Sequence, residues 1–272
     1  MAGIVGVHGI GKYNYYLEAG RSAAGAAEAM RIKWDRYLHV ALGGETRAYF
    51  SEIAYFAHHL HDGRRGGRAP RSAAMERPAQ QVLVAWARNR GVGEHVTGAL
   101  KSFTGWLLDR LDGRSAAFAK LFAPEVAAYL TDADKRERCR QVVADVIRKN
   151  RPEVVIAHSL GSVVTYEALW ANPDLQIDLL ITLGSPLGMR NVIFEQLLPA
   201  PINGRGERPG GVRRWVNIAD KDDIAAIPPN LAVSFTGVDA EELVNLDWID
   251  FHTAEKYLGC PALDPHLRPF LA

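Results

Sequence analysis

Ser159 lies where an apolar run meets a helical pattern, in the segment Val154-Val155-Ile156-Ala157-His158-Ser159-Leu160-Gly161. A serine at the apex of such a strand–turn–helix junction holds its hydroxyl clear of the sheet, and the next backbone N–H can join an oxyanion site at the helix N-terminus. The usual form of this turn is Gly-x-Ser-x-Gly, and Ala157 takes the first small position here. The pattern predicts that Ser159 is a nucleophile; the alternative is a serine that caps an ordinary strand–helix turn.

A serine hydroxyl is a weak nucleophile until a hydrogen-bonded imidazole takes its proton, and an acid then holds that imidazole. Asp220, Asp222 and Asp223 follow a predicted strand and compete for the place of the acid. Two histidines come later: His252 precedes a predicted helix start, and His266 lies in a Pro-rich tail. The chain order serine, acid, histidine is typical of triads built on a strand–turn–helix serine, and His252 is favoured as the base.

Strands and helices alternate along the chain in a way that can position such a group. Short apolar runs predict strands over 4–7, 47–57, 153–157, 179–183 and 214–218. Amphipathic patterns predict helices over 19–42, 79–89, 96–111, 115–130, 132–149 and 162–170. Continuous apolar strands that alternate with helices indicate an α/β fold with a mostly parallel sheet covered on both faces. An acid just past the carboxyl end of a strand is where a triad carboxylate belongs.

Three segments together resemble the α/β-hydrolase superfamily, and most closely its lipases and GPI-inositol-deacylase-like serine esterases. The segments are Val7-His8-Gly9-Ile10-Gly11, Ala157-His158-Ser159-Leu160-Gly161-Ser162 and Leu183-Gly184-Ser185-Pro186-Leu187. The resemblance covers residues 3–11 and about 124–258, and it leaves 60–123 uncovered. It implies the α/β-hydrolase fold, with helices on both faces of the central sheet and a helical cap-like insertion.

The same resemblance assigns roles to residues of this chain. It implies that the backbone N–H groups of Ile10 and Leu160 form the oxyanion hole. It favours Asp223 over Asp220 as the acid, because the acid in this family lies four or five residues past its strand and precedes an apolar residue. It also supports His252, which a tyrosine follows as in the ending typical of the family.

Residues 1–272 are expected to form a single domain, in which about 62–130 is the helical insertion. Its apolar helices either line an acyl pocket or close over the site as a lid, or they simply pack on the sheet. Phe103 and Trp106 are the candidate lid residues, and His8 and His158 are further candidates for the substrate pocket.

Other motifs have weaker readings. Gly6-Val7-His8-Gly9-Ile10-Gly11-Lys12 fits the start of a P-loop, but Tyr13 stands where a Mg²⁺-binding serine or threonine is needed. Lys12 is therefore interpreted as a surface residue. The run His58-His59-Leu60-His61-Asp62 could suggest a metal, yet adjacent histidines point apart, so a polar exit from a strand is favoured. Ser185 precedes a proline instead of a helix, which favours a structural role.

The composition excludes several partners. The formal net charge of +1 gives no field for nucleic acid or an anionic membrane. No window is long and apolar enough for a membrane span, and the first residues lack the basic and apolar stretches of a leader, so neither is expected. With only Cys139 and Cys260 present, a reducing, cytoplasmic location is expected.

We therefore expect a serine hydrolase of the esterase or lipase type that needs no cofactor or metal and acts on a small-molecule or lipid-like ester. The alternatives are a peptidase or thioesterase with the same triad, since fold and triad do not specify the acyl group, and a non-catalytic binding protein.

Overall fold

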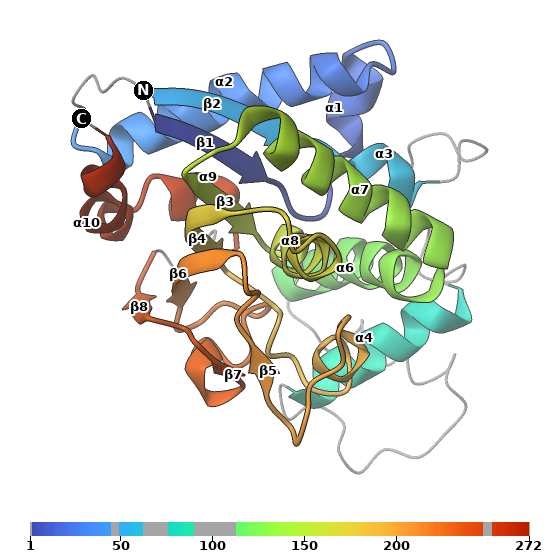
Figure 1. The fold of residues 1–272 in the computed structure, drawn as a ribbon. Coiled ribbons are helices and arrows are strands. Elements are labelled where there is room, and N and C mark those ends of the chain that lie inside the picture. The colour runs from blue at the N-terminus through green and yellow to red at the C-terminus, as the bar shows by residue number, and fades with distance from the viewer. Residues whose placement is uncertain (1, 45–48, 62–75, 90–112, 247–251, 272) are drawn as a thin grey trace.

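The computed structural model describes residues 2–44, 49–61, 76–89, 113–246 and 252–271. Its centre is a six-stranded sheet of order β2-β1-β3-β4-β6-β8, in which every neighbouring pair is parallel (Figure 1). The predicted α/β fold with a mostly parallel central sheet is therefore confirmed. The strands are β1 (Ala2–Val7), β2 (Tyr49–Ala54), β3 (Val154–His158), β4 (Ile177–Leu183), β6 (Val212–Asp220) and β8 (Ala240–Val244).

Side chains of the strands alternate between two apolar clusters, one on each face of the sheet. Along β3, Val154 and Ile156 join α2 (Ala23–Ala41) and α9 (Ala254–Leu258). Their neighbours Val155 and Ala157 join the second cluster, which is the larger one and is called the larger cluster below. That cluster is completed by α4 (Arg77–Asn89), α6 (Gly113–Thr131), α7 (Ala133–Asn150) and α8 (Leu160–Ala171). Helices thus cover both faces, as the apolar, non-alternating strands predict.

The strand order creates a topological switch point beside β1. From β1 the chain passes to β2 on one side, and it later enters β3 on the other side of β1. Val7, near the end of β1, lies opposite Ala157 of β3. In open parallel sheets a crevice forms outside the carboxyl ends of the strands at such a switch point. The turns that follow β1 and β3, which carry His8 and Ser159, meet there.

The described helices of the expected insertion belong to the core. Trp86 of α4 and Phe122 of α6 are fully buried in the larger cluster. The indole N–H of Trp86 also donates to the carbonyl of Ile224, 2.8 Å away, in the loop after β6. Trp86 and Phe122 therefore pack in the core, as expected if these helices pack on the sheet. Phe103 and Trp106 lie outside the described residues.

Shorter elements connect these layers. They are α1 (Tyr13–Glu18), α3 (Ala57–Leu60), α10 (Asp264–Leu267), a two-stranded pair of β5 (Gly206–Glu207) and β7 (Phe235–Thr236), and 3-10 turns at Phe194–Gln196, Leu231–Val233, Pro261–Leu263 and Arg268–Phe270. Cys139 and Cys260 are buried and free. No helix in the described part of the chain is long and apolar enough to cross a membrane.

A buried ion pair joins three of the core helices. The carboxylate of Glu167 on α8 is fully buried, and it accepts hydrogen bonds from the Arg136 guanidinium of α7 and the Tyr129 hydroxyl of α6. The backbone N–H of Leu198 also donates to it. A buried carboxylate is tolerated only when its oxygens are satisfied in this way. These hydrogen bonds therefore fix how α6 and α7 pack against α8, the helix that follows Ser159.

Arg136→Met is expected to lower the free energy of unfolding by about 3–5 kcal/mol, because it leaves the Glu167 carboxylate buried without its charged partner. Arg148→Met is the matched control on α7. Arg148 makes exposed ion pairs with Asp145 and Asp174, so its loss should cost at most about 1 kcal/mol. Denaturant unfolding measures both, and equal losses would contradict the structural role given to the buried pair.

Candidate active site

Ser159 occupies a strained turn between β3 and α8. Its backbone has φ 55° and ψ −132°, a region that costs a residue with a side chain of order 1–3 kcal/mol. The turn is held by the Ser159 N–H, which donates to the Leu183 carbonyl at 2.9 Å, and by the Ser162 hydroxyl, which donates to the Ser159 carbonyl at 2.7 Å. Such strain persists only where the surroundings enforce it, and it clusters at functional sites.

Glycines allow the β1 turn to lie directly against this serine. A Cβ on Gly9 would come 2.5 Å from the Ser159 Cβ, and one on Gly161 would come 2.4 Å from the His8 carbonyl oxygen. Neither contact is possible between real atoms, so both positions require glycine. The Gly-rich turn that resembles a P-loop in sequence is thus packed on Ser159.

The three residues predicted as a triad are joined by hydrogen bonds in the order Ser159, His252, Asp223. His252 Nδ1 lies 2.8 Å from Asp223 Oδ2, and His252 Nε2 lies 2.8 Å from Ser159 Oγ. A carboxylate can only accept, so the Nδ1–H donates to Asp223, and Nε2 is left to accept the serine hydroxyl. The arrangement can move a proton from Ser159 to His252 and hold the cation that results.

Several donors hold the Asp223 carboxylate beside His252. The Tyr257 hydroxyl of α9 donates to Oδ2 at 2.7 Å, and the Ala225 N–H donates to Oδ1 at 2.8 Å. Gly184, at the end of β4, makes room for it, since a Cβ there would lie 2.7 Å from Oδ2. These contacts hold the buried acid in one orientation beside His252.

Asp220, the alternative acid, has a different place. Its carboxylate accepts the backbone N–H groups of Asp222 at 2.7 Å and Leu246 at 2.5 Å. Its own N–H donates to the Tyr257 oxygen at 2.8 Å. Asp222 is exposed. Asp220 thus organises the loop that presents Asp223, and it does not contact His252.

His8 serves the backbone of the β1 turn. Its ring is fully buried; Nδ1–H donates to the Gly9 carbonyl at 2.7 Å, and Nε2 accepts the Phe56 N–H at 3.0 Å. Burial lowers the pKa of His8 to about 3, so the ring stays neutral. The Gly9 carbonyl and the Ile10 N–H belong to one trans peptide and point in opposite directions. His8 was expected to line the substrate pocket; instead it orients the peptide that carries the Ile10 N–H.

Leu160, the other expected donor, is the first residue of α8. Backbone N–H groups in the first turn of a helix have no intrahelical acceptor, and they form the positive end of the helix dipole. Ile10 and Leu160 follow the two turns that meet at Ser159, which is the placement that an oxyanion hole requires.

Aromatic rings surround His252. Phe118 of α6 makes an edge contact with it, with ring centroids 5.0 Å apart. The His158 ring lies 5.0 Å from His252 on another side, and burial lowers its pKa well below the usual value. Neither ring nitrogen of His158 has a hydrogen-bond partner in the described part of the chain. His158 is thus packed against the candidate base, and Phe118, which is half-buried, provides an apolar wall.

The other serine, histidine and lysine residues considered in the sequence make contacts away from the Ser159–His252–Asp223 group. The Ser185 hydroxyl forms a hydrogen bond of 2.7 Å with the Ser162 hydroxyl, which also holds the Ser159 carbonyl, so Ser185 supports the turn. His266 lies between Glu242 and Arg214. Among the described residues, no cluster of three metal-ligating side chains occurs, and His61 contacts Glu125 at 3.2 Å. Lys12, expected at the surface, is half-buried.

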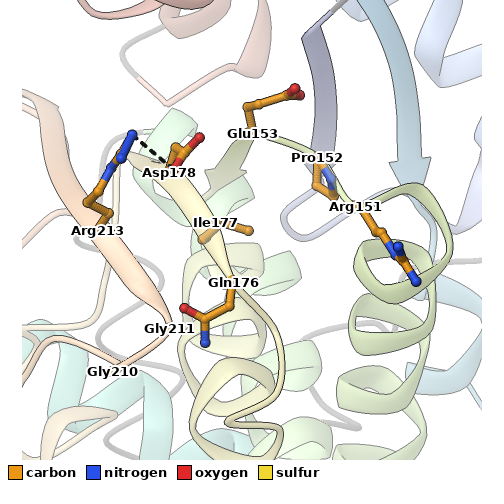
Figure 2. Close-up of a pocket in the computed structure, with 9 residues that line it drawn as sticks. All are labelled: Arg151, Pro152, Glu153, Gln176, Ile177, Asp178, Gly210, Gly211 and Arg213. Atoms are coloured by element: carbon orange, nitrogen blue, oxygen red, sulfur yellow. Dashed lines mark ion pairs between the residues drawn. The ribbon is translucent and has the colours of Figure 1, made fainter.

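A cavity of about 450 Å³ lies at the opposite edge of the sheet, where β3, β4 and β6 begin (Figure 2). Arg213 and Asp178, which both line it, form an ion pair of 3.1 Å. Since parallel strands place their carboxyl ends together, this cavity and Ser159 are separated by the length of the strands. The cavity is lined by Arg151, Pro152, Glu153, Gln176, Ile177, Asp178, Gly210, Gly211 and Arg213.

Comparison with known proteins adds little. No protein family matches the sequence, and no curated protein matches it. Among solved structures, the chain is similar to the crystal structure of the esterase domain from a Rhodothermus marinus protein, with 13% identity and a TM-score of 0.40. The match covers 100% of this chain and 88% of the other. At that TM-score the likeness supports no conclusion about fold or function.

Three contacts of this site have weak signals in the sequence. Phe118 and Glu125 lie in a helix whose sequence predicts only that it packs on the sheet. Its pattern does not indicate which face contacts the turn that carries Ser159. Tyr257 follows His252 by five residues, which is the one hint of its contact with Asp223.

His8→Asn should flatten the dependence of stability on pH. The unfolded chain takes up a proton on His8 below about pH 6.5, whereas the native ring resists protonation down to about pH 3. Stability from this residue is therefore complete above pH 6.5 and is lost as the pH falls, by up to about 1.4 kcal/mol per pH unit. Denaturant unfolding between about pH 4.5 and 7.5 should show a steeper fall for the wild type. His39→Asn, at an exposed site on α2, is the control that should keep the wild-type slope.

Tyr257→Phe should lower the free energy of unfolding by about 1–3 kcal/mol, because it removes a donor from Asp223 and leaves the Asp220 N–H without its acceptor. Thermal or denaturant unfolding measures the loss. Tyr37→Phe, which removes a hydroxyl from α2 away from Asp223, is the matched control and should cost less. Equal stability of Tyr257→Phe and the wild type would contradict the contacts assigned to this hydroxyl.

Proposed function

We propose that this protein is a serine hydrolase that cleaves carboxylic esters, with Ser159 as nucleophile, His252 as base and Asp223 as acid. The observation that carries the proposal is the continuous sequence of hydrogen bonds from Ser159 Oγ through the imidazole to a buried carboxylate, at 2.8 Å on each side. It begins at a serine whose strained backbone lifts it toward the β1 turn. Ordinary caps of helices need neither the strain nor the imidazole.

In the proposed reaction, Ser159 Oγ attacks the ester carbonyl while its proton passes to His252 Nε2. Asp223 stabilises the imidazolium, and the N–H groups of Ile10 and Leu160 hold the oxyanion. His252 then gives the proton to the leaving alcohol, which departs as the acyl-enzyme forms. Water, deprotonated by His252, attacks the acyl carbon and releases the carboxylic acid and free Ser159. No cofactor takes part in these steps.

The surroundings of the site favour an apolar substrate group. Phe118 makes a T-shaped contact with His252 and stacks on Phe122, with ring centroids 5.1 Å apart. Ile10 packs partly exposed against the same cluster. Apolar side chains with a few placed polar groups are typical of sites for small or lipid-like ligands. We infer an ester whose apolar acyl or alkyl part contacts Phe118 and Ile10.

Ser159→Ala should reduce hydrolysis of p-nitrophenyl esters, tested from acetyl to palmitoyl, by at least about 10³-fold, because the alcohol nucleophile is lost. Ser51→Ala, a serine of β2 bonded to Asp35, is the matched control and should retain wild-type turnover. A fluorophosphonate should label the wild type and Ser51→Ala but not Ser159→Ala. Equal turnover by the wild type and Ser159→Ala would refute the proposal, as would a wild type that neither hydrolyses any ester nor reacts with the phosphonate.

A further inference from the structure

Glu125 of α6 is a buried carboxylate that the proposed reaction does not use. Glu125 is 6% exposed, and the other buried side chains of α6, where the structure describes them, are Ala, Val, Leu, Phe and Tyr. A charge in such a place must be held by hydrogen bonds or by an opposite charge. Glu125 Oε2 accepts the Gly11 N–H at 3.0 Å, and Oε1 lies 3.2 Å from His61 Nε2. The carboxylate is therefore directed at the turn that follows β1.

Gly11 is one residue beyond the proposed oxyanion donor Ile10, and its φ of +71° shows that the chain bends sharply there. Two peptide units flank the Ile10 Cα. The first contains the Gly9 carbonyl and is held by His8; the second contains the Gly11 N–H and is held by Glu125. Fixing both units fixes the two backbone dihedrals of Ile10, and with them the direction of its N–H.

We propose that Glu125 is a positioning residue for the oxyanion hole: by holding the Gly11 N–H it fixes the orientation of the Ile10 N–H toward the ester carbonyl. This proposal rests on the proposed function. His8 fixes the turn from the side of the sheet, and Glu125 fixes it from α6. The donor is thus placed before substrate arrives, which is the condition under which a hydrogen bond lowers the barrier most.

The charge of Glu125 by itself opposes the reaction, because a second negative charge near the oxyanion raises the energy of the transition state. The half-buried Lys12 ammonium counters it. Desolvation by burial lowers the pKa of Lys12, and the attraction of Glu125 acts in the opposite direction. His61, stacked on Tyr13 with ring centroids 4.2 Å apart, holds the other carboxylate oxygen. What the reaction needs from this residue is its acceptor oxygen, and not its charge or a proton.

Three variants separate these roles. Glu125→Ala removes the acceptor, and Glu125→Gln keeps an acceptor oxygen without the charge. Thr131→Val is the matched control on α6, since it removes a hydroxyl that donates only to the Ala127 carbonyl of the same helix. For each, kcat and KM are measured with the best p-nitrophenyl ester, together with the inhibition constant of a trifluoromethyl ketone, whose adduct with serine carries an oxyanion. Exchange of the Gly11 amide proton is followed by NMR.

Glu125→Ala should lower kcat by about 10–100-fold with little change in KM, a part of the ~10²–10³-fold that complete loss of an oxyanion donor costs. The inhibition constant of the ketone should rise in parallel, and the Gly11 amide should exchange faster. Glu125→Gln should keep kcat near the wild-type value or above it. Thr131→Val should leave both kcat and the exchange of the Gly11 amide at the wild-type level.

Other results would overturn the proposal. If Glu125→Gln were as slow as Glu125→Ala, the charge or a proton of Glu125 would be the active feature. If Glu125→Ala freed the Gly11 amide without lowering kcat, the turn would be anchored but the donor would not depend on it. Absence of hydrolysis by the wild type would instead remove the proposed function itself, a result that is distinct from any difference among the variants.

Discussion

The close contact between the turns after β1 and β3 is the constraint on which the rest of the site depends. Ser159 adopts its unfavourable backbone because its N–H and carbonyl are both bonded, to Leu183 and Ser162. The β1 turn approaches because Gly9 and Gly161 carry no Cβ. Parallel pairing of β1 with β3 sets the heights of the two turns. A single methyl group at either glycine would push the two turns apart, and with them the serine and the Ile10 N–H.

Buried polar groups around this contact form two sets, and each set lies on a different face of the sheet. Tyr257 and Asp220 hold Asp223 from the side of α9, whereas Glu125 and Glu167 lie in helices of the larger cluster. Burying these carboxylates is unfavourable unless every oxygen finds a donor. Because each does so by bridging two or more elements, the same bonds that make burial tolerable also fix the register between helices, loops and the nucleophile turn.

What the sequence predicts, and what it does not, follows from where each signal lies. The buried strands β3, β4 and β6 each contain a short apolar run, such as Leu179–Ile181 in β4, so their positions are visible in the sequence. The edge strand β8, Ala240–Val244, carries Glu241 and Glu242 and has no such run, since an edge strand is half exposed. Asp223 and Asp220 are both plausible acids in sequence. The resemblance favours Asp223 by its position, but the contacts that distinguish the two acids, Asp223 with His252 and Asp220 with Leu246, form between segments far apart in the chain.

Three imidazoles cluster around the serine turn, and their surroundings give them different chemistry. Both nitrogens of His8 are committed to the backbone, and burial keeps His158 neutral with no acceptor in the described residues for a second proton. Only His252 has a carboxylate on one nitrogen and a hydroxyl on the other. A proton taken from Ser159 therefore has one favourable destination. The neutral neighbours also matter, because a cation on His158, 5.0 Å from His252, would oppose the charge that the proposed base must accept.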